Sequence, residues 1–247
     1  MTSIAITGAT GRMGKRLIAL ARESGNFQII AGIIRPDHQL LGRDAGEIAG
    51  VGQIGVALTS ELRATPQVLI DFTSASATQH WLDVCCERRI AMLIGTTGLD
   101  ATAHAAIDRA AKQIPILQAT NTSVGVALLN KLVAQAAAKF PQDYDVEIVE
   151  SHHRFKKDAP SGTALSLKDS IEAGGQSRRR GEIVTHSLRV GDEIGTHTVS
   201  FAVPGERLEL THVATNRDAF AHGALRAAEW LAKQKPGRHQ IGDVLGF

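Results

Sequence analysis

The sequence predicts an α/β protein with a doubly wound parallel sheet in its first half and a different, open sheet in its second half. Two observations support this prediction. Short apolar runs alternate with helical patterns up to about residue 123, and from there one long helical pattern is followed by strands of alternating polarity. The chain has 247 residues, 43% of them apolar, which is enough for one large core or two modest ones.

Five apolar runs in the first half predict buried strands, because they are rich in Ile, Val and Leu and are bounded by turn residues. They cover residues 4–7, 29–34, 68–72, 91–94 and 116–119. Helices are expected between several of them, at residues 12–23, 77–88 and 101–112. An order of strand, helix and strand implies a parallel sheet with right-handed crossovers. A nucleotide site is then expected at the carboxyl ends of the strands.

The second half begins with a long helix that we expect to start near Ser123. One face of this helix carries seven apolar residues, Leu128, Leu129, Leu132, Val133, Ala136, Ala137 and Phe140. Strands are expected at residues 146–150, 183–190, 197–203 and 208–213, the last two alternating in polarity around the turn Pro204-Gly205. This pattern predicts an antiparallel, open-faced sheet. A final helix over residues 219–233 suits a return of the chain to the first domain.

Charge and cysteine content exclude several classes of protein. A formal net charge of +2 is too small and too dispersed to require a nucleic acid or an acidic membrane as partner. Three arginines at 178–180 favour a solvated loop, although an acidic ligand could still meet them. The adjacent Cys85 and Cys86 cannot join distant segments and lack metal-ligand spacing, so we expect core thiols. The lack of a signal peptide and of a membrane-length apolar run predicts a cytoplasmic protein.

A glycine loop, Gly8-Ala9-Thr10-Gly11-Arg12-Met13-Gly14, follows the first strand and opens the first helix. Three glycines allow a tight turn and a close approach to a pyrophosphate, while the helix N-terminus donates N–H groups to the anion. The spacing departs from the commonest dinucleotide fingerprint, so a purely structural turn stays open.

A second loop, Gly95-Thr96-Thr97-Gly98, comes just after a strand on the same side of the predicted sheet. Its threonines offer hydroxyl and N–H groups to a ligand. A turn in which threonine caps a helix is an equal alternative from the residues alone, and the position at a strand's carboxyl end favours binding.

The densest chemical signal follows the strand at residues 146–150. His152, His153, Arg154, Lys156 and Lys157 are basic, and the turn Pro160-Ser161-Gly162-Thr163 reads as the start of a helix with bare N–H groups. Cations beside a helix N-terminus make a pocket for carboxylates or phosphates. No metal is expected, because adjacent histidines point apart and no carboxylate has suitable ligand spacing.

The stretch from Glu147 to Ala164 resembles the signature of 4-hydroxy-tetrahydrodipicolinate reductases: E-x-x-E-x-H, then lysine four residues on, then D-x-P-S-G-T-A. The resemblance extends over nearly the whole chain, including the first glycine loop, Asp71-Phe72-Thr73, Gly95 to Gly98, Arg189 and His197-Thr198. Phe155 and Thr122 depart from the residues common in the family.

The resemblance implies a Rossmann-like doubly wound parallel sheet domain for binding the dinucleotide, residues 1–123 and 218–247. Residues 124–217 would form an α+β substrate-binding and oligomerisation domain with an open mixed sheet. It also implies a homotetramer that reduces 4-hydroxy-tetrahydrodipicolinate, a small dicarboxylate, with NADPH or NADH in diaminopimelate and lysine biosynthesis.

The resemblance further implies roles for individual residues. His152 and Lys156 match the catalytic pair, with Lys156 as the proton donor. The residues that match contacts to the substrate carboxylates are His153, Lys156, Ser161, Gly162, Thr163 and Thr97. Those that match cofactor contacts are Gly8, Ala9, Thr10, Gly11, Arg12, Met13, Arg35, Phe72, Thr73, Gly95, Thr96, Thr97, Ala119, Thr120, Asn121 and Thr122.

The end of the second strand predicts a preference for NADPH. In dinucleotide-binding folds an acidic side chain at this point accepts hydrogen bonds from the adenosine ribose and repels a 2′-phosphate. Ile34 stands where many members of the family carry that acid, and Arg35 follows with donors that suit a phosphate. A merely solvated Arg35 is the alternative, under which both cofactors would work about equally.

Two other classes of protein stay open. A different dinucleotide-dependent dehydrogenase would not need Lys156 together with the turn at residues 160–163. A noncatalytic nucleotide-sensing protein would keep the first glycine loop while losing the basic stretch. This sequence keeps both features.

Overall fold

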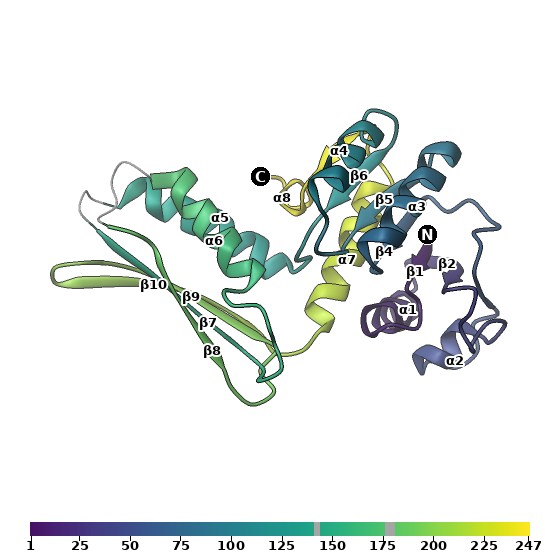
Figure 1. Ribbon diagram of the computed structural model, residues 1–247, viewed down its shortest axis with the longest axis horizontal. Helices are drawn as coiled ribbons and strands as arrows, with labels where there is room; N and C mark the ends of the chain where they lie inside the picture. Colours follow the sequence, from purple (N-terminus) through teal and green to yellow (C-terminus); the bar gives the residue numbers. More distant parts are fainter. Residues whose placement is uncertain (141–143, 176–180) are drawn as a thin grey trace. The chain divides into compact units, whose positions relative to one another are not determined.

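The computed structural model describes residues 1–140, 144–175 and 181–247, so the arginines at 178–180 lie outside the described residues. Two compact units make up the chain (Figure 1): Met1–Ser123 with Phe220–Phe247, and Val124–Ala219. We call them the parallel-sheet unit and the mixed-sheet unit. The predicted fold class, a Rossmann-like parallel sheet plus a separate mixed sheet, is confirmed.

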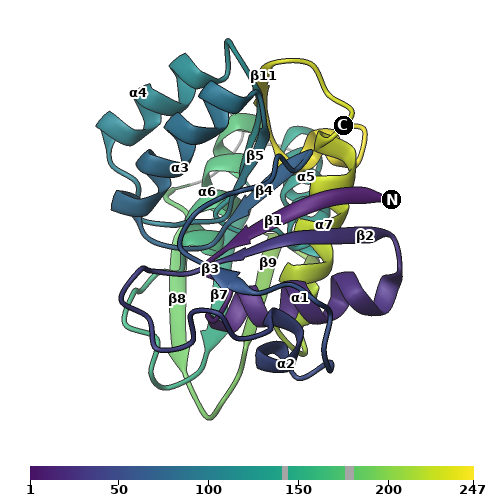
Figure 2. The same ribbon diagram turned by 90° about the vertical axis from the view of Figure 1, so that its right-hand side faces the viewer.

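All pairings in the sheet of the parallel-sheet unit are parallel, in the order β11-β6-β5-β4-β1-β2-β3. The strands are β1 (Thr2–Thr7), β2 (Phe27–Ile33), β3 (Leu58–Thr59), β4 (Val68–Asp71), β5 (Ala91–Ile94), β6 (Pro115–Gln118) and β11 (Gly237–His239). The helices are α1 (Arg12–Ser24), α2 (Ala45–Ala49), α3 (Ala75–Arg88), α4 (Ala101–Ala110), α7 (Asp218–Leu231) and α8 (Ile241–Val244). Figure 2 shows α1 and α7 on one face of the sheet and α3 and α4 on the other.

Alternate residues along each strand enter two different cores, one on each face of this sheet. Ile4 and Ile6 of β1 pack with helices α1 and α7, whereas Ala5 between them belongs to the core under α3 and α4. Because both faces are buried, the strands appear in the sequence as continuous apolar runs. Cys85 of α3 lies in the second core, where burial raises the pKa of its thiol, and Cys86 is half-buried.

Two short elements near residue 50 are held by one carboxylate. Asp44 caps α2 by accepting the N–H groups of Gly46 and Glu47 at 2.8 and 3.1 Å. The same side chain accepts the N–H groups of three residues in the loop before β3, at 54, 55 and 56. Its multiple acceptor sites suit this task. Neither α2 nor β3 was predicted from the sequence.

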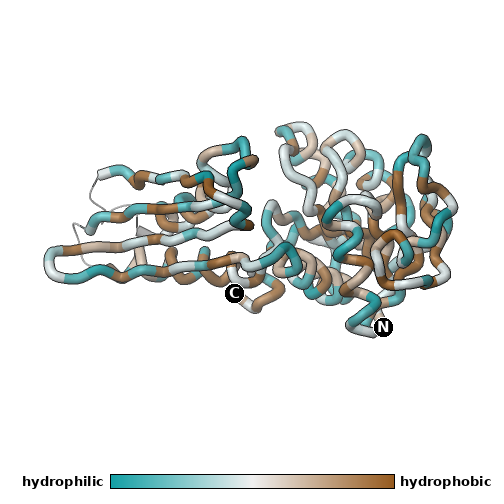
Figure 3. The backbone as a smooth tube through the Cα atoms, turned by 90° about the horizontal axis from the view of Figure 1, so that it is seen from below, coloured by the Kyte–Doolittle hydropathy of each residue, from teal (hydrophilic) through white to brown (hydrophobic). Residues whose placement is uncertain are grey.

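The mixed-sheet unit holds four strands in the order β10-β9-β7-β8. These are β7 (Asp145–His152), β8 (Val184–Arg189), β9 (Gly195–Val203) and β10 (Glu206–Ala214), with helices α5 (Val124–Lys139) and α6 (Gly162–Gly175). Figure 1 shows both helices along one face of the sheet, and Figure 3 shows hydrophilic and hydrophobic stretches alternating along the strands. The antiparallel prediction is wrong for β7 and β8, which are parallel because α6 connects them as a crossover.

Helix α5 buries a narrower stripe than the sequence predicts. Leu129, Val133 and Ala137 enter the core of the mixed-sheet unit together with Phe201 of β9. Leu128 and Leu132 are 45% and 39% exposed, so the predicted face is wrong at these two positions. Each lies one residue before a buried position, which is a rotation of about 100° around the helix axis.

Helix α7 returns the chain to the parallel-sheet unit, where Ala224 and Leu231 are buried in the same core as α1. Gly223 permits close approach, since a Cβ atom there would lie 1.8 Å from the carbonyl oxygen of Thr122. The Thr122 hydroxyl also donates to the carbonyl of Phe220 at 2.6 Å. The places where the chain leaves this unit, after Ser123, and re-enters it, at Phe220, therefore lie side by side.

Candidate functional site

A cavity of about 700 Å³ opens at the carboxyl ends of β1, β2 and β4. This is where the strand order reverses around β1, the expected place for a ligand in an open α/β sheet. The predicted cofactor contacts that line it are Gly8, Thr10, Gly11, Arg35, Phe72 and Thr73. Its volume lies within the usual range for ligand pockets of about 300–1,000 Å³.

The glycine loop beside this cavity fits a phosphate group. Gly8 has φ +68°, and a Cβ atom there would lie 2.6 Å from the carbonyl oxygen of Phe72. At Gly14 a Cβ atom would lie 2.2 Å from the carbonyl oxygen of Gly8, so the loop closes only with glycine at both positions. No side chain caps the first turn of α1, which follows Gly11. Uncapped N–H groups at a helix start bind anions, so these residues fit the pyrophosphate of a dinucleotide.

Four threonine hydroxyls converge on the buried carboxylate of Asp71 at the end of β4. Thr7 and Thr73 donate to one oxygen at 2.7 and 2.6 Å. Thr78 and Thr96 donate to the other at 2.5 and 2.9 Å. Asp71 therefore ties together the ends of β1, β4 and β5 and the first turn of α3, and it holds two predicted cofactor contacts, Thr73 and Thr96.

The other predicted cofactor contacts do not line the cavity. The Ala9 N–H donates to Ile33 within the protein at 3.1 Å, and the side chain of Met13 packs against the core. Gly95 leaves room for the Phe72 ring, since a Cβ atom there would lie 2.2 Å from it. Thr97, Thr120 and Arg12 are exposed, Ala119 and Thr122 are buried, and Asn121 is half-buried. Contacts from these residues to a cofactor stay predictions.

The end of β2 supplies the residues expected to meet the adenosine. Ile34 is buried against the cavity, so no acidic side chain stands there. Arg35 is 80% exposed, and its Nε lies 3.6 Å from Asp37. His38, which the sequence reasoning missed, accepts the Leu40 N–H at Nδ1, so its proton sits on Nε2, 3.2 Å from the Thr10 hydroxyl.

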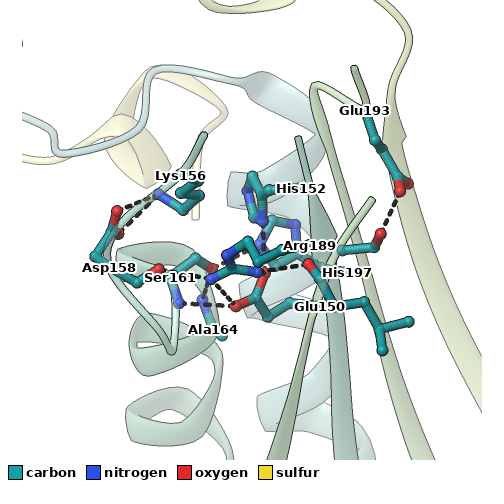
Figure 4. Close-up of polar contacts among 11 residues, drawn as sticks. Glu150, His152, Lys156, Asp158, Ser161, Ala164, Arg189, Glu193 and His197 are labelled. Atoms are coloured by element: carbon teal, nitrogen blue, oxygen red, sulfur yellow. Dashed lines mark hydrogen bonds and ion pairs between the residues drawn. The ribbon is translucent and has the colours of Figure 1, made fainter. Parts of the chain in front are cut away.

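A second polar cluster lies in the mixed-sheet unit, around the end of β7 (Figure 4). At its centre the fully buried Glu150 carboxylate accepts two hydrogen bonds from Arg189, at 2.9 and 2.8 Å. It also lies 2.5 Å from His152 Nδ1 and accepts the Ser161 N–H at 3.2 Å. Burial raises the pKa of Glu150, but the hydrogen bonds from Arg189, Ser187 and His152 outweigh burial and hold it at about 2.

Two histidine rings pack edge to face in this cluster, with the centroids of His152 and His197 5.1 Å apart. Burial lowers the pKa of His152, although its hydrogen bond with Glu150 acts in the opposite sense. Burial and the neighbouring His152 lower the pKa of His197 to about 4. His197 Nε2 lies 2.9 Å from the Ser161 hydroxyl. Both imidazoles are therefore neutral near pH 7.

The Lys156 ammonium is paired with the Asp158 carboxylate, at 2.9 and 2.7 Å from its two oxygens. Figure 4 shows the lysine turned toward Asp158. The hydrogen bond from Lys156 lowers the pKa of Asp158, so the carboxylate is ionised at neutral pH. Arg189 donates to the Asp158 carbonyl at 2.5 Å, which fastens the loop that carries Lys156 to the end of β8.

Helix α6 begins at the predicted anion-binding turn. The Ser161 hydroxyl accepts the Ala164 N–H at 3.1 Å, the bond expected of an N-cap residue. Gly162 is exposed, and a Cβ atom there would meet no atom of the described residues within 4 Å, apart from its chain neighbours and its own helix backbone. The half-buried His153 donates its backbone N–H to Glu193 at 2.7 Å. Open space beside a helix start suits a carboxylate ligand.

The structure thus brings His152, His153, Lys156 and the turn at residues 161–163 together in one unit. Thr97 belongs to the other unit, and its contact with a substrate stays a prediction. Three supporting residues were missed: Glu150, Arg189 and His197. All three stand in the stretches that resemble the family, but their pairing across 36 or 39 residues has no sequence signal. Among the described residues no group of three His, Cys, Asp or Glu side chains is placed to hold a metal ion.

Two family models match the chain. They are described as dihydrodipicolinate reductase, N-terminus, over residues 2–122 and dihydrodipicolinate reductase, C-terminus, over residues 125–245. The chain is 45% identical to the 4-hydroxy-tetrahydrodipicolinate reductase of Myxococcus xanthus, and the alignment covers 100% of this chain and 98% of that protein. It is 44% identical to the protein of that name from Alkalilimnicola ehrlichii, and the alignment covers 100% of this chain and 99% of that protein. In fold it resembles the dipicolinate-bound dihydrodipicolinate reductase from Paenisporosarcina sp. TG-14, with a TM-score of 0.82, 24% identity and 100% of both chains covered.

Proposed function

The chain belongs to the dihydrodipicolinate reductase family, and we propose that it reduces 4-hydroxy-tetrahydrodipicolinate in lysine and diaminopimelate biosynthesis. The substrate, NAD(P)H and a proton give tetrahydrodipicolinate, NAD(P)⁺ and water. One observation carries the assignment of the site: His152, Lys156 and the start of α6 lie in one cluster at the end of β7. A dicarboxylate needs such an arrangement of cations beside a helix N-terminus.

The glycine loop, Phe72, Thr73 and Arg35 would hold the cofactor in the cavity of the parallel-sheet unit. Bound reduced nicotinamide supplies a hydride. The negative charge that then develops on the substrate ring must be quenched by a positioned acid. Lys156 is our proposed donor, because its side chain is only 21% exposed and its ammonium is fixed by Asp158. Ser161, Gly162 and Thr163 would take a substrate carboxylate.

Replacing the proposed acid tests this assignment. Lys156→Ala is expected to lower kcat by about two orders of magnitude, the usual scale for loss of a positioned acid. The assay follows NADPH oxidation with substrate made by a dihydrodipicolinate synthase. Lys157→Ala is the matched control, since Lys157 is exposed and neighbours Lys156. Near wild-type turnover of Lys156→Ala would show that another group donates the proton.

A ligand experiment separates this function from the two other classes. Pyridine-2,6-dicarboxylate, a planar mimic of the substrate, is expected to raise the thermal midpoint only when cofactor is present. A nucleotide-sensing protein would respond to cofactor alone. An unrelated dehydrogenase would not respond to the dicarboxylate under any condition.

For the cofactor we propose a preference for NADPH over NADH, supported by Ile34 in place of an acid and by Arg35 at the cavity.

For assembly we propose a homotetramer that uses the face of the mixed sheet opposite α5 and α6. Val184, Leu188 and Val213 on that face are 45%, 51% and 55% exposed. Light scattering that gives the mass of a monomer at micromolar concentration would refute the assembly.

No helix in the described part of the chain is long and apolar enough to span a membrane. A cytoplasmic location, and the lack of nucleic-acid and membrane partners, stay predictions.

A further inference from the structure

Three segments of the mixed-sheet unit donate hydrogen bonds to one buried carboxylate, that of Glu150. Arg189 at the end of β8 binds both of its oxygens. His152, two residues further along β7, approaches with Nδ1 at 2.5 Å. The Ser161 N–H reaches it from the start of α6 at 3.2 Å. Figure 4 shows Glu150 as the point at which these three segments meet.

The charge of Glu150 decides which nitrogen of His152 carries the proton. With a pKa of about 2, the carboxylate is ionised at neutral pH and only accepts hydrogen bonds. Nδ1 must then be the donor in the 2.5 Å contact. In a neutral imidazole this leaves Nε2 without a proton. Gly195 makes room for Nε2, since a Cβ atom at that position would lie 2.9 Å from it.

The same carboxylate also holds the loop at residues 153–161. Its bond to the Ser161 N–H fixes the end of the loop that enters α6. Arg189, which Glu150 orients with two bonds, donates to the Asp158 carbonyl at 2.5 Å and so fixes the middle of the loop. Lys156 lies on this loop and is paired with Asp158. Both proposed catalytic side chains therefore depend on Glu150.

We propose that Glu150 is a positioning residue: it keeps the proton of His152 on Nδ1, so that Nε2 is offered to the ligand, and it holds the loop that carries Lys156. The inference rests on the proposed function in treating His152 and Lys156 as catalytic. The alternative is a buried ion pair that only stabilises the fold. Such a pair would affect the free energy of unfolding and leave the tautomer of His152 unchanged.

Nitrogen NMR of the histidine rings distinguishes these two roles. Wild-type His152, assigned with a His152→Gln variant, is expected to carry its proton on Nδ1 when neutral. In Glu150→Gln we expect the amide oxygen to keep the bonds from Arg189 Nη2 and Ser161. The amide nitrogen then replaces the oxygen that faced Arg189 Nη1 and His152 Nδ1, which loses the first bond and moves the imidazole proton to Nε2. We expect kcat to fall about tenfold or more, since a general acid or base depends on its protonation state. Cofactor affinity is expected to stay unchanged.

The pKa of His152 gives a second readout. Glu150 from β7, Glu193 before β9, Arg189 from β8, Lys156 from the loop and His197 from β9 surround it. Without the negative charge of Glu150, the positive charges of Arg189 and Lys156 dominate the surroundings of His152. The pKa of His152 is therefore expected to fall in Glu150→Gln, and an acid limb of kcat set by His152 moves to lower pH.

Glu147→Gln is the matched control. Glu147 lies on the same strand and also pairs with a histidine, His186, at 2.7 Å, but both side chains are about half exposed. This variant is expected to leave the His152 tautomer and kcat unchanged. Arg189→Lys separates the second part of the proposal, because it keeps the Glu150 charge and loses the bond to the Asp158 carbonyl. We expect it to raise the KM for the dicarboxylate about tenfold with the His152 tautomer unchanged.

A wild-type His152 proton on Nε2 would overturn the proposal, whether or not Glu150→Gln folds. So would an unchanged tautomer in a folded Glu150→Gln. Wild-type KM and kcat in Arg189→Lys would refute the part that concerns the loop. These spectra need no substrate, so an absence of reductase activity would refute the proposed function and leave the tautomer to be decided separately.

Discussion

Two buried carboxylates, Asp71 and Glu150, support the two polar clusters in different ways. Asp71 is surrounded by threonine hydroxyls, whereas Glu150 has an arginine and a histidine as partners. A buried charge is costly unless it is well hydrogen-bonded. Hydroxyls supply this without a countercharge, so Asp71 does not occupy Arg35, the cation that we propose for the cofactor phosphate. Around Glu150 the positive charge of Arg189 already faces the carboxylate, and Lys156, which we propose for the dicarboxylate, is paired with Asp158.

Arg35 is expected to decide the choice of cofactor. Its exposed guanidinium at the cavity can pair with the 2′-phosphate of NADPH, a charge-assisted contact of about 1.5–3 kcal/mol. We predict that wild-type kcat/KM favours NADPH by about tenfold to a hundredfold. Arg35→Ala should narrow this ratio through weaker NADPH binding, measured by calorimetry, with little change for NADH. Equal specificity constants in the wild type at moderate salt would refute the prediction.

His197 is expected to make the protein sensitive to mild acid. Its pKa is lowered from 6.5 to about 4 in the folded protein, so the unfolded chain binds a proton more readily between these values. The contribution of the neutral His197 to the free energy of unfolding is therefore fully present above pH 6.5. It is lost as the pH falls toward 4, by on the order of 3 kcal/mol. The contribution of Glu150 to stability is lost only when the pH falls below 4.5, the pKa of an unperturbed glutamate.

Denaturant unfolding of His197→Gln at several pH values checks this prediction. The variant keeps a polar side chain for Ser161 and should flatten the dependence of the unfolding free energy on pH between 6.5 and 4. His186→Gln, at an exposed position on β8, is the control. The prediction fails if wild type and His197→Gln lose stability equally across this range.

The residues of the site that sequence reasoning found are close together in the chain. His152, Lys156 and the turn at residues 160–163 form one stretch, so their residue types and spacing already suggest an anion pocket. Glu150 and Arg189 are 39 residues apart, and their pairing depends on the parallel register of β7 with β8. A sequence pattern that predicts an antiparallel sheet cannot place them together.

At the scale of elements, prediction succeeds where enough residues share one environment. The strands of the parallel sheet are buried on both faces and read as apolar runs. Strand β3 spans 2 residues and β11 spans 3, too few for any periodicity to appear. Helix α5 is apolar nearly all round, so its buried stripe is set by α6 and the sheet rather than by its own composition.

The start of α6 gives a prediction for this element. Gly162 faces open space beside the Ser161 cap, where a side chain would occupy the volume proposed for a substrate carboxylate. We predict that Gly162→Leu raises the KM for the dicarboxylate strongly and leaves NADPH affinity nearly unchanged, as measured by calorimetry. Leu165→Ala is a matched control on the same helix, because Leu165 is 48% exposed. A parallel loss of NADPH affinity in Gly162→Leu would place this turn elsewhere.

At the scale of the whole molecule, each unit has cores of its own. Among the described residues, the apolar clusters on the two faces of the parallel sheet contain no residue of β7, β8, β9 or β10, and the third cluster contains only residues of the mixed-sheet unit. Separate cores permit separate unfolding transitions, so a single free energy of unfolding need not describe the chain. NADPH should raise the midpoint temperature of the transition of the parallel-sheet unit more than that of the mixed-sheet unit.

The close approach of Gly223 to Thr122, together with the bond from Thr122 to Phe220, makes the mixed-sheet unit an insertion into the chain of the other unit. An insertion whose two ends are neighbours can be excised without stretching the host chain. We predict that joining Ser123 to Asp218 through a short glycine linker gives a folded, NADPH-binding miniprotein with no affinity for dipicolinate. Circular dichroism and calorimetry would test this. Failure to fold would mean that the parallel-sheet unit needs the mixed-sheet unit to be stable. The two units could then not be inherited or exchanged as separate modules.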